Sequence, residues 1–346
     1  MFDYVIITHL PAFYKVNLYN EIAKKLNIYV IFIATNTADK RAKDFTQTHH
    51  DMQFKYKILY DGAFQLRPKI QNLFALYQLL KTIHYKKLIV NGWDLPEFWF
   101  ATWISDKRKN CVALESTIVE SNVTGIKRYI KKFFLSRIST VFASGHLHVA
   151  LLNKLNYHGL IKTTKGVGII NKPIFNKRIT EYQKRFLFVG RLSYEKNLKT
   201  VIDIFNTLPQ YYLTIVGEGA EKDELKARAK ENIVFLDSIE NKELKNVFTQ
   251  NNVFILPSIV EPWGLVVEEA LFFGLPVIVS KNCGVCELIE DGENGLYVNP
   301  LNIQDMKEAI LKIDDTLYNK FLTNVNAFSF IEKDLWQVEQ YCSSQI

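Results

Sequence analysis

Two glutamates eight positions apart mark the segment of the chain best suited to chemistry. Glu261 lies in a turn after the apolar run Val253–Leu256, and Glu269 lies within an almost wholly apolar helix predicted over 264–273. Hydrophobic packing alone would not select these acids, because a buried carboxylate is costly unless hydrogen-bond donors reach it. The paired hydroxyls of a sugar are such donors, so the two acids predict a sugar-binding site.

Two cations flank a second turn. The apolar run 186–189 predicts a strand ending at Gly190, and a helix is predicted from Asn197 onward. Arg191 and Lys196 therefore border a strand-to-helix turn at the carboxyl edge of a parallel sheet, where ligands of α/β folds bind. A helix N-terminus with two cations suits a diphosphate. The alternative is a pair of surface cations near the start of a helix.

Strand-length apolar runs alternate with helical patterns along the chain. This alternation predicts an α/β protein with parallel sheets covered by helices on both faces. Strands are expected near 4–8, 28–34, 87–91, 111–115, 140–143, 167–170, 186–189, 212–216, 233–236, 253–256 and 277–279, with helices including 16–26, 70–84, 123–136 and 264–273.

Length and composition narrow the class of protein. The 346 residues suit two domains of ordinary size, and no apolar run is long enough to predict a transmembrane helix. The first residues look like a strand rather than a signal peptide, and four cysteines do not make a disulfide framework, so we expect a cytoplasmic protein. The net charge of +7 fits anionic partners such as nucleotides or lipid headgroups, and we expect no nucleic-acid partner.

The two glutamates form a Glu-x7-Glu signature that belongs to a longer series of short motifs. Each motif is weak alone, but together and in this order they resemble the family-four retaining glycosyltransferases (glycosyl transferases group 1) of the surface-polysaccharide type. The matching segments are Gly190-Arg191-Leu192-Ser193-Tyr194-Glu195-Lys196-Asn197, Val216-Gly217-Glu218-Gly219, Glu261 to Ile278, Gly284-Val285 with Glu287-Leu288-Ile289, and Asp291-Gly292-Glu293-Asn294-Gly295.

This resemblance implies the GT-B fold, in which two Rossmann-like domains with parallel sheets face a central cleft. Residues 1–172 would form an acceptor-binding domain and residues 173–327 a domain that binds the nucleotide-sugar donor. Residues 328–346 would form a C-terminal helix that crosses back to the first domain.

The resemblance also assigns roles in the donor half. Arg191 and Lys196, next to Gly190, would stabilise the diphosphate as the bond to the sugar breaks. Glu269 would accept hydrogen bonds from the two ribose hydroxyls, and its neighbour Glu268 is expected to point to solvent or a surface cation.

Glu261 would lie nearer the transferred sugar, where it would act as a catalytic residue that stabilises positive charge at the anomeric carbon; capping of the helix is the alternative. The backbone amides of Trp263, Gly264 and Leu265 would contact sugar hydroxyls or phosphate. No two aspartates have the Asp-x-Asp spacing of metal-dependent glycosyltransferases, so we expect neither a metal nor another cofactor.

Candidate acceptor-side residues follow strands of the first half. The segment from His9 to Lys15, which contains Pro11 and Tyr14, resembles a Pro-Tyr-Arg turn of some family members, with Lys15 in place of arginine. His9, Tyr14 and Lys15 are therefore candidates for the acceptor side. Trp93 lies in a turn similar to a Gly-Gly-Trp turn and would either stack on a sugar ring or be buried. Glu115 ends a strand, where it would be a second catalytic residue or else an acid paired with a lysine.

The helix predicted over 123–136 carries an apolar stripe and a basic face. The basic helix at 126–137 would either bind an anionic membrane surface or pack its stripe into the core and leave its lysines in water, and the need for packing favours the second. The pair Cys283 and Cys286 cannot complete a zinc site alone, so we expect no metal or redox function there.

These observations predict a retaining, metal-independent glycosyltransferase that moves a sugar from a nucleoside diphosphate, most simply UDP, to a hydroxyl of a surface glycan or lipid-linked saccharide. It would act in the cytoplasm or on the inner face of the cytoplasmic membrane. The alternatives are a non-catalytic nucleotide-sugar-binding subunit, and a sugar-nucleotide epimerase or phosphorylase on the same architecture.

Overall fold

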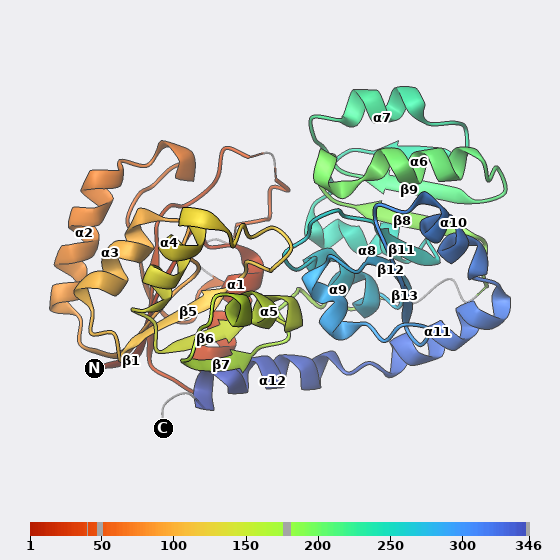
Figure 1. The fold of residues 1–346 in the computed structure, drawn as a ribbon. Coiled ribbons are helices and arrows are strands. Elements are labelled where there is room, and N and C mark those ends of the chain that lie inside the picture. The colour runs from red at the N-terminus through yellow and green to blue at the C-terminus, as the bar shows by residue number, and fades with distance from the viewer. Residues whose placement is uncertain (40, 47–50, 176–180, 344–346) are drawn as a thin grey trace. The chain divides into compact units, whose positions relative to one another are not determined.

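The computed structural model describes residues 1–39, 41–46, 51–175 and 181–343 (Figure 1). The chain divides into two compact units. The first unit comprises Met1–Asp39, Phe45–Ile169 and Ile331–Ile346, and the second comprises Lys40–Asp44 and Ile170–Phe330. Each unit is an α/β domain built on a parallel sheet.

The first unit holds a seven-stranded parallel sheet with the order β3-β2-β1-β4-β5-β6-β7. Parallel strands covered on both faces are rich in Val, Ile and Leu, and the interior strand β1 has this character. The strands are β1 (Phe2–Thr8), β2 (Ile28–Phe32), β3 (Lys55–Ile58), β4 (Tyr85–Val90), β5 (Asn110–Leu114), β6 (Thr140–Ala143) and β7 (Leu160–Thr163).

Six helices belong to this unit, and buried side chains place several of them on opposite faces of the sheet. Val5 and Ile7 of β1 share a core with α2, α3, α4 and α5, whereas Tyr4 and Ile6 share a second core with α1 and α12. The alternation along β1 follows the two-residue period of a strand. The helices are α1 (Phe13–Ala23), α2 (Lys69–Thr82), α3 (Pro96–Ile104), α4 (Gly125–Leu135), α5 (His146–Lys154) and α12 (Phe330–Cys342).

The second unit holds a six-stranded parallel sheet with the order β10-β9-β8-β11-β12-β13. Its strands are β8 (Arg185–Val189), β9 (Tyr212–Val216), β10 (Ile233–Leu236), β11 (Val253–Leu256), β12 (Val277–Ser280) and β13 (Gly295–Val298). Its helices are α6 (Leu198–Asn206), α7 (Lys222–Arg228), α8 (Leu244–Phe248), α9 (Leu265–Phe272), α10 (Ile303–Lys312) and α11 (Asp315–Ala327). Neighbouring strands β8 and β11 are the ones whose following turns carry the candidate site.

The C-terminal helix α12 packs on the first unit. The Tyr4 hydroxyl donates a hydrogen bond of 2.6 Å to the Tyr341 carbonyl oxygen, and the Tyr341 ring stacks on Phe142 at a centroid distance of 4.3 Å. The Trp336 indole N–H also donates to the Thr163 carbonyl, at 3.0 Å. These contacts explain why the last residues group with the first unit rather than with the second.

Most predicted elements are confirmed, but the strand predicted at 167–170 is wrong. The last strand of that sheet is β7, and 167–170 is irregular, with the Ile169 N–H bonded to the Tyr14 carbonyl at 2.9 Å. A side chain at Gly168 would lie 2.5 Å from the Tyr14 backbone, so this segment is held by close approach to α1. A short buried apolar run does not distinguish a strand from such a segment.

The predicted packing of the apolar stripe on 123–136 is also wrong. Of the helix α4, only Phe134 and Leu135 are buried, while Ile126, Tyr129, Ile130 and Phe133 are exposed. Within the described part of the chain, no helix is long and apolar enough to cross a bilayer.

Candidate functional site

The turn between β11 and α9 is built around a glycine and held by backbone hydrogen bonds. Gly264 begins α9 with φ +100°, a conformation that suits glycine, and an added Cβ would lie 3.3 Å from Val285. The Glu261 carbonyl accepts from the Gly284 N–H at 3.0 Å, and the Trp263 carbonyl accepts from the Val285 N–H at 2.9 Å. The turn is therefore tied to the 3₁₀ helix Gly284–Leu288 and holds Glu261 in place.

Lys196 and Glu261 form an ion pair at the ends of two neighbouring strands. The Lys196 ammonium donates to the Glu261 carboxylate, and the two side chains are only 11% and 15% exposed. Lys196 ends a 3₁₀ turn after β8, and Glu261 follows β11, which pairs with β8. The structure thus brings together two residues, 65 positions apart in sequence, that the motifs single out.

Arg191 lies in the same turn and remains accessible. Its side chain is 50% exposed, and its Nη2 atom lies 3.5 Å from the Glu195 carboxylate. A weak exposed contact of this kind leaves the guanidinium able to take another anion. Arg191 and Lys196 therefore give this turn two cations, one half-exposed and one in a largely buried pair.

Glycines at the neighbouring strand end allow backbone segments to touch. A Cβ at Gly217 would lie 1.9 Å from the Gly190 carbonyl oxygen, and one at Gly219 would lie 2.2 Å from the Leu192 carbonyl oxygen. The Gly190 N–H in turn donates to the Val216 carbonyl at 3.0 Å. Gly217 and Gly219 thus position the Gly190–Arg191 turn by close packing.

The adjacent acids Glu268 and Glu269 have opposite environments. Glu268 is fully buried and accepts a hydrogen bond of 2.5 Å from the Trp263 indole N–H, so the expectation that it points to solvent is wrong. The indole N–H of Trp263 is thus a donor to the buried Glu268 carboxylate.

Glu269 has no such donor among the described residues, where its carboxylate makes no hydrogen bond or ion pair. Burial raises its pKa to about 8, with further contributions from the negative charges of Glu268 and Asp44. Asp44 comes from the short segment of the first half of the chain that groups with the second unit, where its carboxylate accepts the Asn241 N–H at 3.0 Å. Glu269 is therefore a partly buried carboxyl group to which no described residue donates a hydrogen bond, and a ligand could supply such donors.

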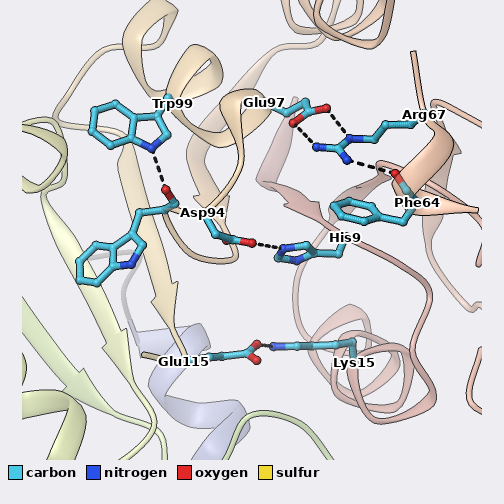
Figure 2. Close-up of polar contacts among 9 residues, drawn as sticks. His9, Lys15, Phe64, Arg67, Asp94, Glu97, Trp99 and Glu115 are labelled. Atoms are coloured by element: carbon cyan, nitrogen blue, oxygen red, sulfur yellow. Dashed lines mark hydrogen bonds and ion pairs between the residues drawn. The ribbon is translucent and has the colours of Figure 1, made fainter. Parts of the chain in front are cut away.

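Polar side chains in the first unit form a second cluster (Figure 2). Lys15 of α1 is buried and donates to the carboxylate of Glu115, which follows β5. Burial alone would lower the pKa of Lys15, but the attraction of Glu115 and of the nearby tyrosines outweighs it and raises that pKa. The alternative that Glu115 pairs with a lysine is confirmed, and a role on the substrate stays a prediction.

His9 is held by an acid and two aromatic rings. Its Nε2 atom lies 2.8 Å from the Asp94 carboxylate, and its ring meets the Phe98 ring edge-on at a centroid distance of 5.0 Å. His9 follows β1 and Asp94 follows the adjacent strand β4, so their approach follows from strand order. Figure 2 draws the His9–Asp94 contact together with the Lys15–Glu115 pair.

A buried ion pair near His9 was not predicted. Arg67 donates to both carboxylate oxygens of Glu97, at 2.8 and 3.2 Å, and both side chains are at most 5% exposed. The guanidinium also lies 4.0 Å from the centre of the Phe64 ring, which packs against His9. Nothing in the sequence indicates this pair, because its members are 30 residues apart in elements that only the folded sheet brings together.

Trp93 and Tyr14 are placed mainly by packing. The Trp93 ring is partly buried, meets the Phe134 ring at a centroid distance of 6.3 Å, and has the Lys131 ammonium 5.4 Å from its centre. Tyr14 packs its ring edge-on against Phe13 at 5.7 Å. Of the two alternatives for Trp93, these contacts support burial, and stacking on a sugar ring stays a prediction.

The two cysteines near the donor turn are unsuited to thiolate chemistry. Cys283 and Cys286 are buried, and burial raises the pKa of Cys286 to about 12 and that of Cys283 well above its usual value. A thiol that stays protonated is neither a nucleophile nor a metal ligand. Throughout the described ranges, no group of three or more His, Cys, Asp or Glu side chains is placed to hold a metal ion.

Comparison with known proteins agrees with the donor-site motifs. Residues 170–320 match the model of a family described as Glycosyl transferases group 1. An uncharacterized glycosyltransferase of Methanocaldococcus jannaschii is 29% identical over 167 residues, which cover 46% of this chain and 43% of that protein. The sulfoquinovosyl transferase of Arabidopsis thaliana is 32% identical over 138 residues, 39% of this chain and 26% of that protein. The chain thus spans less than half the length of these curated relatives.

The fold of the whole chain also has counterparts among solved structures. The HepE protein of Anabaena, solved in complex with UDP and glucose, superposes with a TM-score of 0.75 at 17% identity, over 99% of this chain and 100% of that one. At that identity the likeness shows the architecture alone, which is GT-B. Residues 170–320 therefore match the family Glycosyl transferases group 1, within a chain that has the GT-B fold.

Proposed function

We propose that this protein is a retaining glycosyltransferase that transfers a sugar from a nucleoside diphosphate to a hydroxyl of a surface glycan or lipid-linked saccharide. The observation that carries the proposal is the arrangement of the second unit. There an accessible Arg191, the Lys196–Glu261 pair and Glu269, whose carboxyl group has no partner among the described residues, all lie in the segment that matches the glycosyltransferase family.

The Lys196–Glu261 ion pair suggests how donor binding prepares the site. A diphosphate offers Lys196 more negative charge than one carboxylate does, so the ammonium would turn to the phosphates. Glu261 would then be released to accept hydrogen bonds from the hydroxyls of the transferred sugar and to stabilise positive charge at its anomeric carbon. Before the donor binds, the opposite charges of Lys196 and Glu261 therefore compensate each other.

Arg191 and Lys196 would stabilise the leaving diphosphate. As the glycosidic bond breaks, negative charge grows on the diphosphate oxygens, and fixed cations stabilise that charge more than they stabilise the ground state. Two cations and the backbone amides of the turn would do this without a metal ion. The absence of an Asp-x-Asp pair from the sequence supports the same inference.

Glu269 would recognise the nucleoside. A carboxylate has two oxygens and accepts one hydrogen bond on each from neighbouring ribose hydroxyls. None of the described residues donates a hydrogen bond to Glu269, and a buried carboxylate is costly without such donors. The hydroxyls of a bound ribose would supply them. We infer UDP as the nucleotide because a protein of the same fold, HepE, has been solved with UDP and with UDP-glucose.

The first unit would bind the acceptor. Its candidate groups are the Lys15–Glu115 pair, the His9–Asp94 pair and Trp93. Glu115 and His9 would orient the attacking hydroxyl, since both keep part of their side chain in contact with solvent. A surface glycan or lipid-linked saccharide offers many such hydroxyls, and the surface-polysaccharide type of the sequence motifs supports that class.

The experiment that tests the proposal is donor turnover in EDTA, measured as release of nucleoside diphosphate from UDP-sugars and GDP-sugars with and without acceptor glycans. We expect turnover that depends on an acceptor and falls about a hundredfold or more in Glu261→Gln. Glu290→Gln is the control, because Glu290 is an exposed acid of the same unit.

Other outcomes assign the protein to the alternatives. Conversion of the donor without any acceptor would indicate an epimerase, and dependence on inorganic phosphate would indicate a phosphorylase. Nucleotide binding without turnover under any condition would indicate a non-catalytic binding subunit. Any of these results would overturn the proposed transfer.

A further inference from the structure

Helix α4 exposes its apolar side chains instead of burying them. A helix that packs on a sheet normally turns its apolar stripe inward. In α4 the stripe of Ile126, Tyr129, Ile130 and Phe133 recurs at intervals of three and four residues, and these side chains are between 48% and 75% exposed. The stripe therefore lies on the outer side of the helix.

The basic side chains of the same helix lie at its flanks and on its inner side. Arg128, Lys131 and Lys132 are half-buried, and Lys131 donates to the Asn122 carbonyl at 3.0 Å. Lys127 is exposed, next to Ile126. Keeping cations against the body of the domain while apolar groups face water is unfavourable for a protein in water alone.

The exposed stripe continues onto the end of α3. Trp103 and Ile104 are 45% and 43% exposed, and the Trp103 ring lies 4.7 Å from the Phe133 ring. We call this surface the α4 patch; it consists of Trp103, Ile104, Ile126, Tyr129, Ile130 and Phe133. A contiguous exposed apolar surface bordered by polar groups marks an interaction site.

The sequence that contains α4 is strongly basic, although the negative charge of Glu120 lies near Lys131. Residues 121–180 contain eleven Lys or Arg and no Asp or Glu, so this stretch carries +11 while the rest of the chain carries −4, for the total of +7. The described residues of α4 include no acid. The surface that adjoins the patch therefore attracts anions.

We propose that the α4 patch docks on an anionic lipid bilayer, with its apolar side chains among the acyl chains and its flanking lysines at the headgroups. Apolar and aromatic groups on one side of a helix with Lys and Arg at its edges are the features of helices that lie in a membrane interface. The length of α4 is too short to span a bilayer, so the helix would lie in the plane of the surface.

A second copy of the chain is the competing occupant, and charge argues against it. In a symmetric dimer built on the patch, the basic flanks of both copies would lie at one interface, and like charges would repel. An anionic lipid surface instead attracts each lysine. The proposal does not depend on the transferase assignment, because it concerns a surface outside the donor turn.

The test is flotation of the protein with vesicles of phosphatidylcholine alone, and of equal parts phosphatidylcholine and phosphatidylglycerol. We expect binding to the anionic vesicles only, weakened by salt. Ile130→Asp should weaken that binding about tenfold or more, because an aspartate can neither enter the acyl region nor approach the anionic surface. Lys127→Gln with Lys132→Gln should weaken it about twentyfold.

Ile303→Asp is the matched control, because Ile303 is an isoleucine of the other unit that is 58% exposed on helix α10. This variant should bind vesicles as the wild type does, and all variants should keep the wild-type melting temperature and nucleotide affinity. Failure of the wild type to float with anionic vesicles would overturn the proposal. So would a dimer in solution that Ile130→Asp converts to a monomer, since the patch would then be a protein interface.

Discussion

Replacing Glu269 by glutamine is expected to stabilise the unliganded protein at high pH while it weakens nucleotide binding. Burial raises the pKa of this carboxyl group from 4.5 to about 8. Between these values the folded protein keeps a proton on Glu269 that the unfolded chain has released. The free energy of unfolding therefore falls as the pH rises through this window, and the full loss is present above about pH 8.

The size of this loss follows from the two pKa values. Each pKa unit is equivalent to about 1.36 kcal/mol, so the upper limit is about 5 kcal/mol. Because the Glu269 side chain keeps some contact with water, screening reduces the expected loss to about 2 kcal/mol. For a domain the size of the second unit, that corresponds to about 4 to 8 °C in melting temperature.

The assay is calorimetric unfolding of the wild type and Glu269→Gln at intervals from pH 5 to about pH 9. The variant should match the wild type at the acid end and exceed it by about 2 kcal/mol at the alkaline end. Glu290→Gln is the matched control, because Glu290 is an exposed acid of the same unit and its replacement should leave the pH dependence of unfolding unchanged. A difference between Glu269→Gln and the wild type that does not change with pH would refute the reasoning.

Three further substitutions test individual contacts, each by urea unfolding. Trp263→Phe should lower the free energy of unfolding by about 1 to 3 kcal/mol, because the buried Glu268 carboxylate loses its indole donor; an unchanged value would contradict that hydrogen bond. Gly264→Ala should lower it by about 1 to 3 kcal/mol, since φ is +100° there; equal stability would mean that the turn adopts another conformation. Lys15→Met should lower the free energy of unfolding by about 1 to 3 kcal/mol, because Glu115 loses its cation. The double variant Lys15→Met with Glu115→Gln should recover part of that loss.

Much of the fold could be predicted because strands and helices leave different periodic patterns. The alternation of apolar runs with helical patterns identifies most elements of both sheets. The strands β3, β7 and β13 were missed, and each of them is only four residues long. The irregular segment 167–170 was mistaken for a strand, because a short apolar sequence is typical of any buried segment and not of strands alone.

The site could be predicted in part, because chemistry-bearing residues gather where parallel strands end. Lys196 and Glu261 follow strands that proved to be neighbours, which the motifs suggested and the sheet order explains. The Glu268–Trp263 and Arg67–Glu97 contacts were not predictable in this way. They depend on which way a side chain turns and on which loops meet, and neither follows from spacing along the chain.

The orientation of α4 could not be predicted from the sequence either. Its sequence predicts an amphipathic helix correctly, but periodicity does not say which side of the helix the protein covers. The two possible orientations lead to different functions, a packed core helix or a membrane-binding surface. Only the exposure of Ile126 and its neighbours distinguishes them.

The measurement that tests the central claim most directly is calorimetric titration of UDP, in EDTA, into the wild type, Arg191→Ala and Arg185→Ala. Arg185 begins β8 and Arg191 lies in the turn after its end, so the second variant removes a cation of the same unit at the far end of the strand from the donor turn. We expect metal-free binding that weakens about tenfold or more in Arg191→Ala and stays unchanged in Arg185→Ala. Binding that requires a divalent metal, or that is insensitive to Arg191→Ala, would contradict the assignment of this turn as the diphosphate site.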